Sequence, residues 1–143
     1  MKDKQSERDT RGIPINKVGV KGLRHPIQVL DLANRTQDTI ATINMYVDLP
    51  HHFKGTHMSR FVETINHHGK IIHVENIEKI VREMRERLDA EEAHLEIEFP
   101  YFIEKKAPIS KARGLVDYTG FFTANLKGRT LDFSYGVVVP VTT

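Results

Sequence analysis

The sequence contains no cysteine, which excludes disulfide bonds, thiolate metal ligands and cysteine nucleophiles from these 143 residues. No apolar run approaches the roughly 20 residues that a membrane-spanning helix needs. The polar first dozen residues also lack the apolar stretch of a signal peptide. We therefore expect a cytoplasmic protein that does not bind membranes.

Tryptophan is absent too, and there are only four tyrosines. The 21 Lys and Arg against 19 Asp and Glu leave a net charge of +2, far from a strongly basic surface. Because no basic stripe is interleaved with aromatic residues, nucleic acid is not an expected partner.

The residues that are present fit an ordinary globular domain. Hydrophobic residues make up 39% of the chain and charged residues 28%, and the length suits one hydrophobic core. Residues 1–12 are almost wholly polar and are predicted to form a disordered tail. Residues 13–143 are predicted to form a single domain.

Hydrophobic periodicity predicts two strands, two helices and then three strands. The strands are expected at residues 27–33, 39–49, 94–103, 115–125 and 130–141. Residues 13–26 contain two glycines and two prolines, and they predict an irregular entry to the first strand. Pro100 implies an edge position or a bulge in its strand, and Lys127-Gly128 predicts a hairpin turn between the last two strands.

The ends of both helices are marked in the sequence. Thr56 is predicted to cap the first helix, and Gly69 suits its C-terminal end. Asn76 is predicted to cap the second helix, whose apolar residues recur at helical spacing up to Leu88. Strands flanking a helix pair predict an α+β fold, an antiparallel sheet with two helices packed on one face.

The segment KGTHMSRF, residues 54–61, combines basic, hydroxyl and histidine side chains at a helix N-terminus. Free N–H groups and the positive end of the helix dipole suit phosphate at such a position. A second basic pair follows a later strand and could add positive charge to a cleft. The candidate residues are Lys54, Thr56, His57, Arg60, Lys105 and Lys106. From spacing alone a purely structural role is favoured, because most helix N-termini bind nothing and most strand-end lysines are solvated.

The eight histidines raise the question of a metal site. His51, His52 and His57 cluster between a predicted strand and the first helix, but no HExxH motif accompanies them. A catalytic metal needs three well-placed protein ligands, so loop and capping roles are favoured for these three. His67 and His68 are interpreted as solvated residues that complement the helix dipole.

Four runs of the sequence closely resemble the N-terminal half of the type IB GTP cyclohydrolases, prokaryotic enzymes that open folate synthesis. The runs are, in order, RGIPINKVGVKGLRHPI, KGTHMSRFVE, FPYFIEKKAPIS and VVVPVTT, and the resemblance extends over residues 11–143. It implies the tunnelling fold (T-fold), in which a unit of two strands, two helices and two strands is duplicated and assembles into a barrel by oligomerisation. A homo-oligomer, a tetramer, is the expected assembly.

The resemblance also implies an activity, the hydrolysis of GTP to 7,8-dihydroneopterin triphosphate and formate. A divalent metal, which could be zinc, manganese or iron, would activate water for attack on purine C8. Because a triphosphate requires positive groups, GTP as substrate supports substrate-binding roles for the basic candidates. These are Lys54, Thr56, His57 and Arg60, with Lys105 and Lys106 behind them.

The sequence departs from the family pattern after its last strand. In the family, PVTT leads into a Leu-Cys-Pro-Cys segment, and that cysteine forms the metal and catalytic site together with downstream histidine and glutamate residues. This sequence reaches Thr143 without a cysteine, so no catalytic or metal-binding residue is carried over. We expect the N-terminal portion of the enzyme, inactive by itself. The alternative is a non-catalytic T-fold module that binds a purine or pterin or serves in assembly.

Overall fold

The computed structural model describes residues 16–30, 36–48, 50–68, 71–72, 74–106 and 113–139. The predicted tail at residues 1–12 lies outside these ranges. The elements are, in chain order, β1 (Lys17–Leu30), β2 (Thr36–Asp48), the 3-10 helix η2 (Gly55–Met58), α2 (Ser59–His68), β3 (Ile71–Ile72), α3 (Val74–Arg87), β4 (Glu92–Lys106), β5 (Arg113–Lys127) and β6 (Thr130–Val138).

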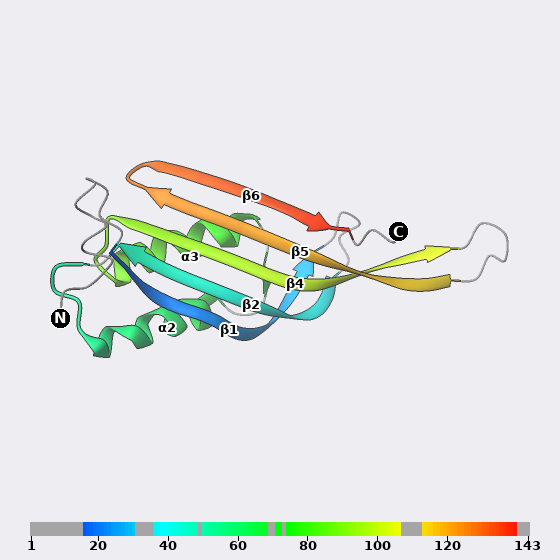
Figure 1. Ribbon diagram of the computed structural model, residues 1–143, viewed down its shortest axis with the longest axis horizontal. Coiled ribbons are helices and arrows are strands. Elements are labelled where there is room, and N and C mark those ends of the chain that lie inside the picture. The colour runs from blue at the N-terminus through cyan, green and yellow to red at the C-terminus, as the bar shows by residue number, and fades with distance from the viewer. Residues whose placement is uncertain are drawn as a thin grey trace, which may run out of the picture.

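The strands form a six-stranded sheet in the order β3-β1-β2-β4-β5-β6, and both α-helices cover one face of it (Figure 1). Every neighbouring pair is antiparallel except β1 with the two-residue β3. The predicted α+β fold, an antiparallel sheet with two helices on one face, is confirmed. The arrangement is consistent with a T-fold unit.

The core lies between the helices and the sheet. Alternate residues of β2, among them Ile43, Met45 and Val47, are fully buried, as the period-two pattern of a strand with one buried face requires. From the other side, Phe61 of α2 and Ile80 of α3 are fully buried against the same cluster. Each such side chain contributes about 1.5–3 kcal/mol by leaving water, so this layer fixes the helices on the sheet.

The predicted irregular entry at residues 13–26 is wrong over its described part, because β1 already begins at Lys17. The two glycines that suggested a loop have other roles within the β1–β2 pairing. A Cβ on Gly19 would lie 1.9 Å from the Met45 carbonyl oxygen, so Gly19 allows β1 and β2 to approach closely. Gly22 has a φ of +75° at the point where the β1–β2 register shifts, which is a β-bulge.

Pro100 lies in β4 beyond the stretch that pairs with β2, which ends at Glu98. There Gln37 takes over as a side-chain partner, accepting from the Phe102 N–H at 2.7 Å and donating to the Phe102 carbonyl at 2.9 Å. The nitrogen of Pro100, two residues earlier in β4, faces β2 as the Phe102 N–H does. The predicted edge-like position is therefore correct, because no ladder hydrogen bond is lost.

Both predicted helix caps are corrected by the structure. The chain turns into η2 at Lys54, before Thr56, and the Thr56 carbonyl accepts a hydrogen bond from the Ser59 hydroxyl at 3.3 Å. α3 begins at Val74, so Asn76 lies inside the first turn rather than at its cap. The first helix ends at His68, directly before Gly69, as predicted.

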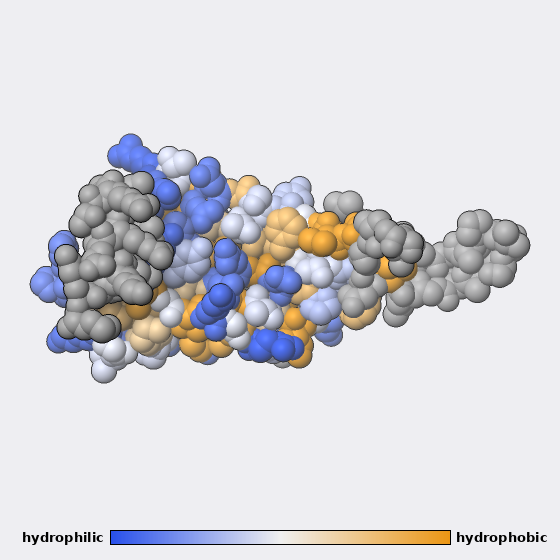
Figure 2. All heavy atoms as spheres, in the orientation of Figure 1, coloured by the Kyte–Doolittle hydropathy of each residue, from blue (hydrophilic) through white to orange (hydrophobic). Residues whose placement is uncertain are grey.

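The hairpin of β5 and β6 forms as predicted, with its turn at Gly128 and Arg129. Gly128 adopts a φ of +58°, which favours glycine in a two-residue turn. β6 is the outer strand of the sheet and carries exposed apolar side chains, with Tyr135 at 68% and Val138 at 56% exposure. Figure 2 shows hydrophobic surface over the C-terminal end of this strand.

Neither helix of the described ranges has the length and hydrophobicity to cross a lipid bilayer.

Candidate functional site

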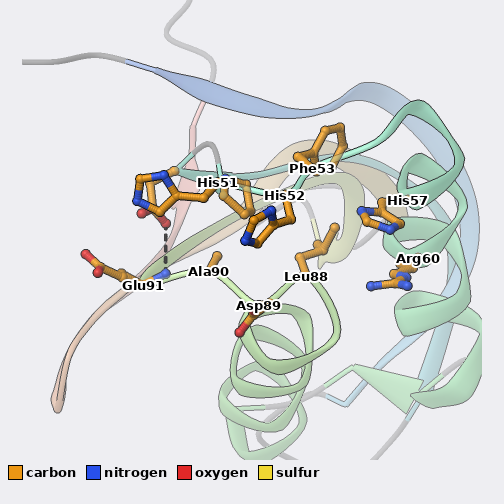
Figure 3. Close-up of a pocket in the computed structure, with 11 residues that line it drawn as sticks. His51, His52, Phe53, His57, Arg60, Leu88, Asp89, Ala90 and Glu91 are labelled. Atoms are coloured by element: carbon orange, nitrogen blue, oxygen red, sulfur yellow. Dashed lines mark hydrogen bonds between the residues drawn. The ribbon is translucent and has the colours of Figure 1, made fainter.

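A cleft of about 670 Å³ opens where the end of β2, the start of α2 and the turn between α3 and β4 meet. Figure 3 shows His57 and Arg60 on one wall and Asp89 and Glu91 on the other, with His52 between them. The lining residues are Asp48, Pro50, His51, His52, Phe53, His57, Arg60, Leu88, Asp89, Ala90 and Glu91.

His57 is held in one orientation by the chain around it. Its ring Nδ1 accepts a hydrogen bond from the Lys54 backbone N–H at 3.1 Å, while the backbone N–H of His57 donates to the Lys54 carbonyl at 2.9 Å. The ring of Phe53 contacts it edge-on, with centroids 5.6 Å apart. Because Nδ1 is an acceptor, the neutral ring carries its proton on Nε2.

The electrostatic surroundings of His57 also favour its neutral form. Desolvation lowers the pKa of the imidazole, and the positive charges of Arg60 and Lys54 lower it further. These two cations therefore act on the same ring. They create a local positive potential at the start of the helix.

Arg60 joins the two helices. Its Nη1 donates a hydrogen bond of 2.8 Å to the carbonyl of Arg87, the last residue of α3. The last carbonyls of a helix lack intrahelical partners and carry partial negative charge. Arg60 thus has a structural role, and its remaining N–H donors lie on the wall of the cleft.

The opposite wall is acidic and is fixed by Asp48. The Oδ1 atom of Asp48 accepts hydrogen bonds from the backbone N–H groups of Glu91 at 3.1 Å and Glu92 at 2.7 Å. These bonds connect the end of β2 to the start of β4. Asp89 closes α3 with a φ of +51° and is exposed, as is Glu91. The cleft therefore presents a cationic wall facing an acidic wall.

The structure brings together some of the predicted residues and separates others. His57 and Arg60 line the cleft, and the exposed residues Lys54, just before η2, and Thr56, in η2, lie beside it. Lys105 and Lys106 end β4, whose first residue lies next to the cleft. At about 3.3 Å per residue that strand places them roughly 40 Å away, so they do not join the cleft of the same chain.

Several cleft residues were not found by sequence reasoning. Asp48, Asp89 and Glu91 come from strand and helix ends whose meeting depends on the tertiary fold. His51 and His52 were considered as metal ligands and then assigned loop or capping roles, not a place in this cleft. The Asp-Leu-Pro-His-His run just before the basic segment was the available signal for them.

The described residues contain a group that could hold a metal ion, and it lies outside this cleft. His67 and His68 at the end of α2 and Glu83 of α3 each bring one ligand atom within 4.8 Å of the others. The described cleft residues form no such group of three. Spacing along the sequence could not indicate this cluster, since α2 and α3 contribute to it separately.

Comparisons with known proteins extend the picture. The family model described as "Type I GTP cyclohydrolase folE2" matches residues 1–143. A protein of Geobacter sulfurreducens named GTP cyclohydrolase FolE2 is 58% identical over 99% of this chain and 55% of its own length. The protein of the same name from Geobacter metallireducens is 58% identical over 99% of this chain and 54% of its own length. The one from Nitrosococcus oceani is 51% identical over 99% of this chain and 53% of its own length. The chain spans about half the length of these curated relatives.

Proposed function

Because the chain belongs to the FolE2 family of type I GTP cyclohydrolases, we propose that it supplies part of an enzyme that hydrolyses GTP to 7,8-dihydroneopterin triphosphate and formate. This reaction is the first step of folate biosynthesis. The name FolE2 replaces the type IB label that the sequence motifs suggested. The cytoplasmic location expected from the sequence stays a prediction.

The observation that carries the proposal is the cleft with two walls of opposite charge. A guanine nucleotide has an anionic triphosphate at one end and N–H donors on its base at the other. The cationic wall, where Arg60 carries the charge and neutral His57 adds an N–H donor, suits the phosphates. The acidic wall, with Asp89 and Glu91, suits the N–H groups of guanine, since ionised carboxylates are hydrogen-bond acceptors.

The residues of the cationic wall have separate tasks in this proposal. Arg60 donates one hydrogen bond to the Arg87 carbonyl and has other N–H donors for phosphate oxygens. His57, with Nδ1 accepting from Lys54, offers Nε2–H as a neutral donor. Lys54, just before η2, and Thr56, in η2, are exposed at the edge of the cleft and add an ammonium and a hydroxyl.

Lys105 and Lys106 fit this proposal only through a second copy of the chain, because β4 carries them roughly 40 Å from the cleft of their own chain. Figure 1 shows the ends of β4 and β5 extending as an arm beyond the other strands. Phe102 on this arm and Tyr135 on the outer strand β6 are exposed apolar side chains, which favours association. We therefore propose a homo-oligomer, a tetramer, in which the lysine pair approaches the substrate of another copy.

The divalent metal that the family resemblance implies does not fit the described residues of this cleft. His51, His52 and His57 come with Asp48, Asp89 and Glu91, but no three of these bring ligand atoms close enough to share one ion. The carboxylate of Asp48 is already engaged by two backbone N–H groups. We therefore assign water activation to residues outside this chain, in the part of the relatives that it does not match.

GTP turnover tests the proposal. The full reading frame of the gene is expressed and incubated with GTP and Mn²⁺ or Zn²⁺, and both pterin fluorescence and formate are measured. We expect one formate per GTP consumed, and no product from the 143 residues alone. Nucleotide or pterin binding without turnover by the full product would instead support the non-catalytic module.

A further inference from the structure

The C-terminal end of α2 and the middle of α3 form a cluster of two histidines and one glutamate. Both histidines approach the same oxygen, Glu83 Oε1, with His67 Nδ1 at 2.7 Å and His68 Nε2 at 3.3 Å. Arg60 at the start of α2 is about 10 Å along the helix from His67. The cluster thus lies at the opposite end of α2 from the cleft.

His68 is the residue that a hydrogen-bonding role alone does not explain. Its side chain is only 14% exposed, and its Nε2 atom is buried without a hydrogen-bond partner among the described residues. The nitrogen is close to Glu83 Oε1, but the contact lacks hydrogen-bond geometry. A buried polar atom without a partner is costly, and a bound cation would satisfy it.

The distances are close to those of a metal site. Zinc bound to imidazole nitrogen and carboxylate oxygen at about 2.0–2.1 Å in tetrahedral geometry separates neighbouring ligand atoms by about 3.3 Å. The His68–Glu83 pair already has this separation, and the His67–Glu83 pair needs to open slightly. The two ring nitrogens lie within 4.8 Å of each other, and the side chain of His67 is 62% exposed.

Glu83 is held in the form that a metal ligand requires. Arg87 Nε donates to its other oxygen, Oε2, at 2.9 Å, which orients the carboxylate and leaves Oε1 toward the histidines. The carboxylate is therefore oriented so that Oε1 faces both histidines.

We propose that His67 Nδ1, His68 Nε2 and Glu83 Oε1 bind a divalent transition metal ion, with Zn²⁺ the best match to two imidazoles and one carboxylate. Water completes the coordination shell on the exposed side of His67. The ion links the end of α2 to α3 and holds the outer layer of the fold together. This inference rests on the side-chain geometry and does not depend on the GTP reaction.

Isothermal titration with ZnCl₂ tests the proposal on the 143-residue chain without added nucleotide, because this chain holds none of the residues to which water activation is assigned. The variants Glu83→Gln and His68→Ala each remove one ligand. Glu63→Gln is the matched control, because Glu63 contacts Arg87 at 3.4 Å in the same ion-pair network but supplies no ligand atom. Since loss of an outer partner of a metal ligand typically costs 10–100-fold in affinity, we expect at least about 100-fold from loss of a ligand itself.

The expected result is one saturable zinc site in the wild type and in Glu63→Gln, with at least 100-fold weaker binding in both ligand variants. Circular dichroism of each variant without metal establishes that it is folded. Cobalt provides a second readout, because Co²⁺ bound at this site gives visible absorption that Glu83→Gln abolishes. Equal zinc affinity in the wild type and both ligand variants, or no saturable site in the wild type, would overturn the proposal.

Discussion

Replacing Arg60 with alanine removes the hydrogen bond that joins the start of α2 to the last carbonyl of α3. A hydrogen bond from a charged donor contributes about 1.5–3 kcal/mol, and a cation near a helix C-terminus about 0.3–1 kcal/mol. Because water can partly replace the guanidinium at the cleft, we expect a loss of about 2 kcal/mol in the free energy of unfolding.

Urea unfolding followed by circular dichroism measures this loss. For a chain of 143 residues, about 2 kcal/mol corresponds to a fall in melting temperature of roughly 6–10 °C. Arg60→Lys keeps the positive charge near the helix end but lacks the planar fork of donors, so it should recover less than half of the lost stability.

Arg82→Ala is the matched control, because Arg82 forms an exposed pair with Glu78 one turn earlier on α3. Such a pair is worth about 0.3–0.5 kcal/mol. If Arg60→Ala and Arg82→Ala lowered the free energy of unfolding equally, the assignment of Arg60 as the connection between the two helices would be refuted.

Three further predictions follow from individual contacts. Gly120→Ala should lower the free energy of unfolding by about 1–3 kcal/mol in a urea titration, because the new Cβ would lie 2.4 Å from the Phe99 ring; unchanged stability would contradict this close packing. An NMR titration of His57 should give a pKa below 6.5. The unfolded chain then binds more protons, so His57 reduces stability as the pH falls below 6.5, and His57→Ala should remove that part of the slope; a pKa of 6.5 would give no slope and a higher one would reverse its sign. Tyr135→Lys on β6 should shift the protein toward smaller species in sedimentation velocity, since it places a charge on an exposed apolar strand; an unchanged distribution would exclude this strand as the interface.

Local sequence patterns predicted the individual strands and helices better than the contacts between them. The alternation in β2 and β4 and the helical spacing in α3 each report on one element. The Glu78–Arg82 and Glu83–Arg87 ion pairs of α3 likewise join residues four apart on one helix. The sequence of β1 was misinterpreted because Gly19 serves a close approach to Met45 across the sheet. That requirement comes from the neighbouring strand and leaves no signal in the local pattern.

The same limit applies to the candidate site. His57 and Arg60 of the KGTHMSRF segment line the same cleft, since one turn of chain connects them, and their role in binding stays a prediction. The hydrogen bond from Arg60 to Arg87 and the approach of His67 to Glu83 depend on how α2 packs against α3. Lys105 and Lys106 looked like neighbours of the cleft only because the length of β4 was not considered.

The location of the nucleotide is the most direct test of the central claim that the cleft at the start of α2 holds the substrate. GTP is titrated into the isotopically labelled chain, and backbone amide shifts are followed by NMR. We predict saturable shifts concentrated at residues 54–60 and 88–91. Saturable shifts elsewhere on the sheet or helices, with these two segments unchanged, would contradict the account.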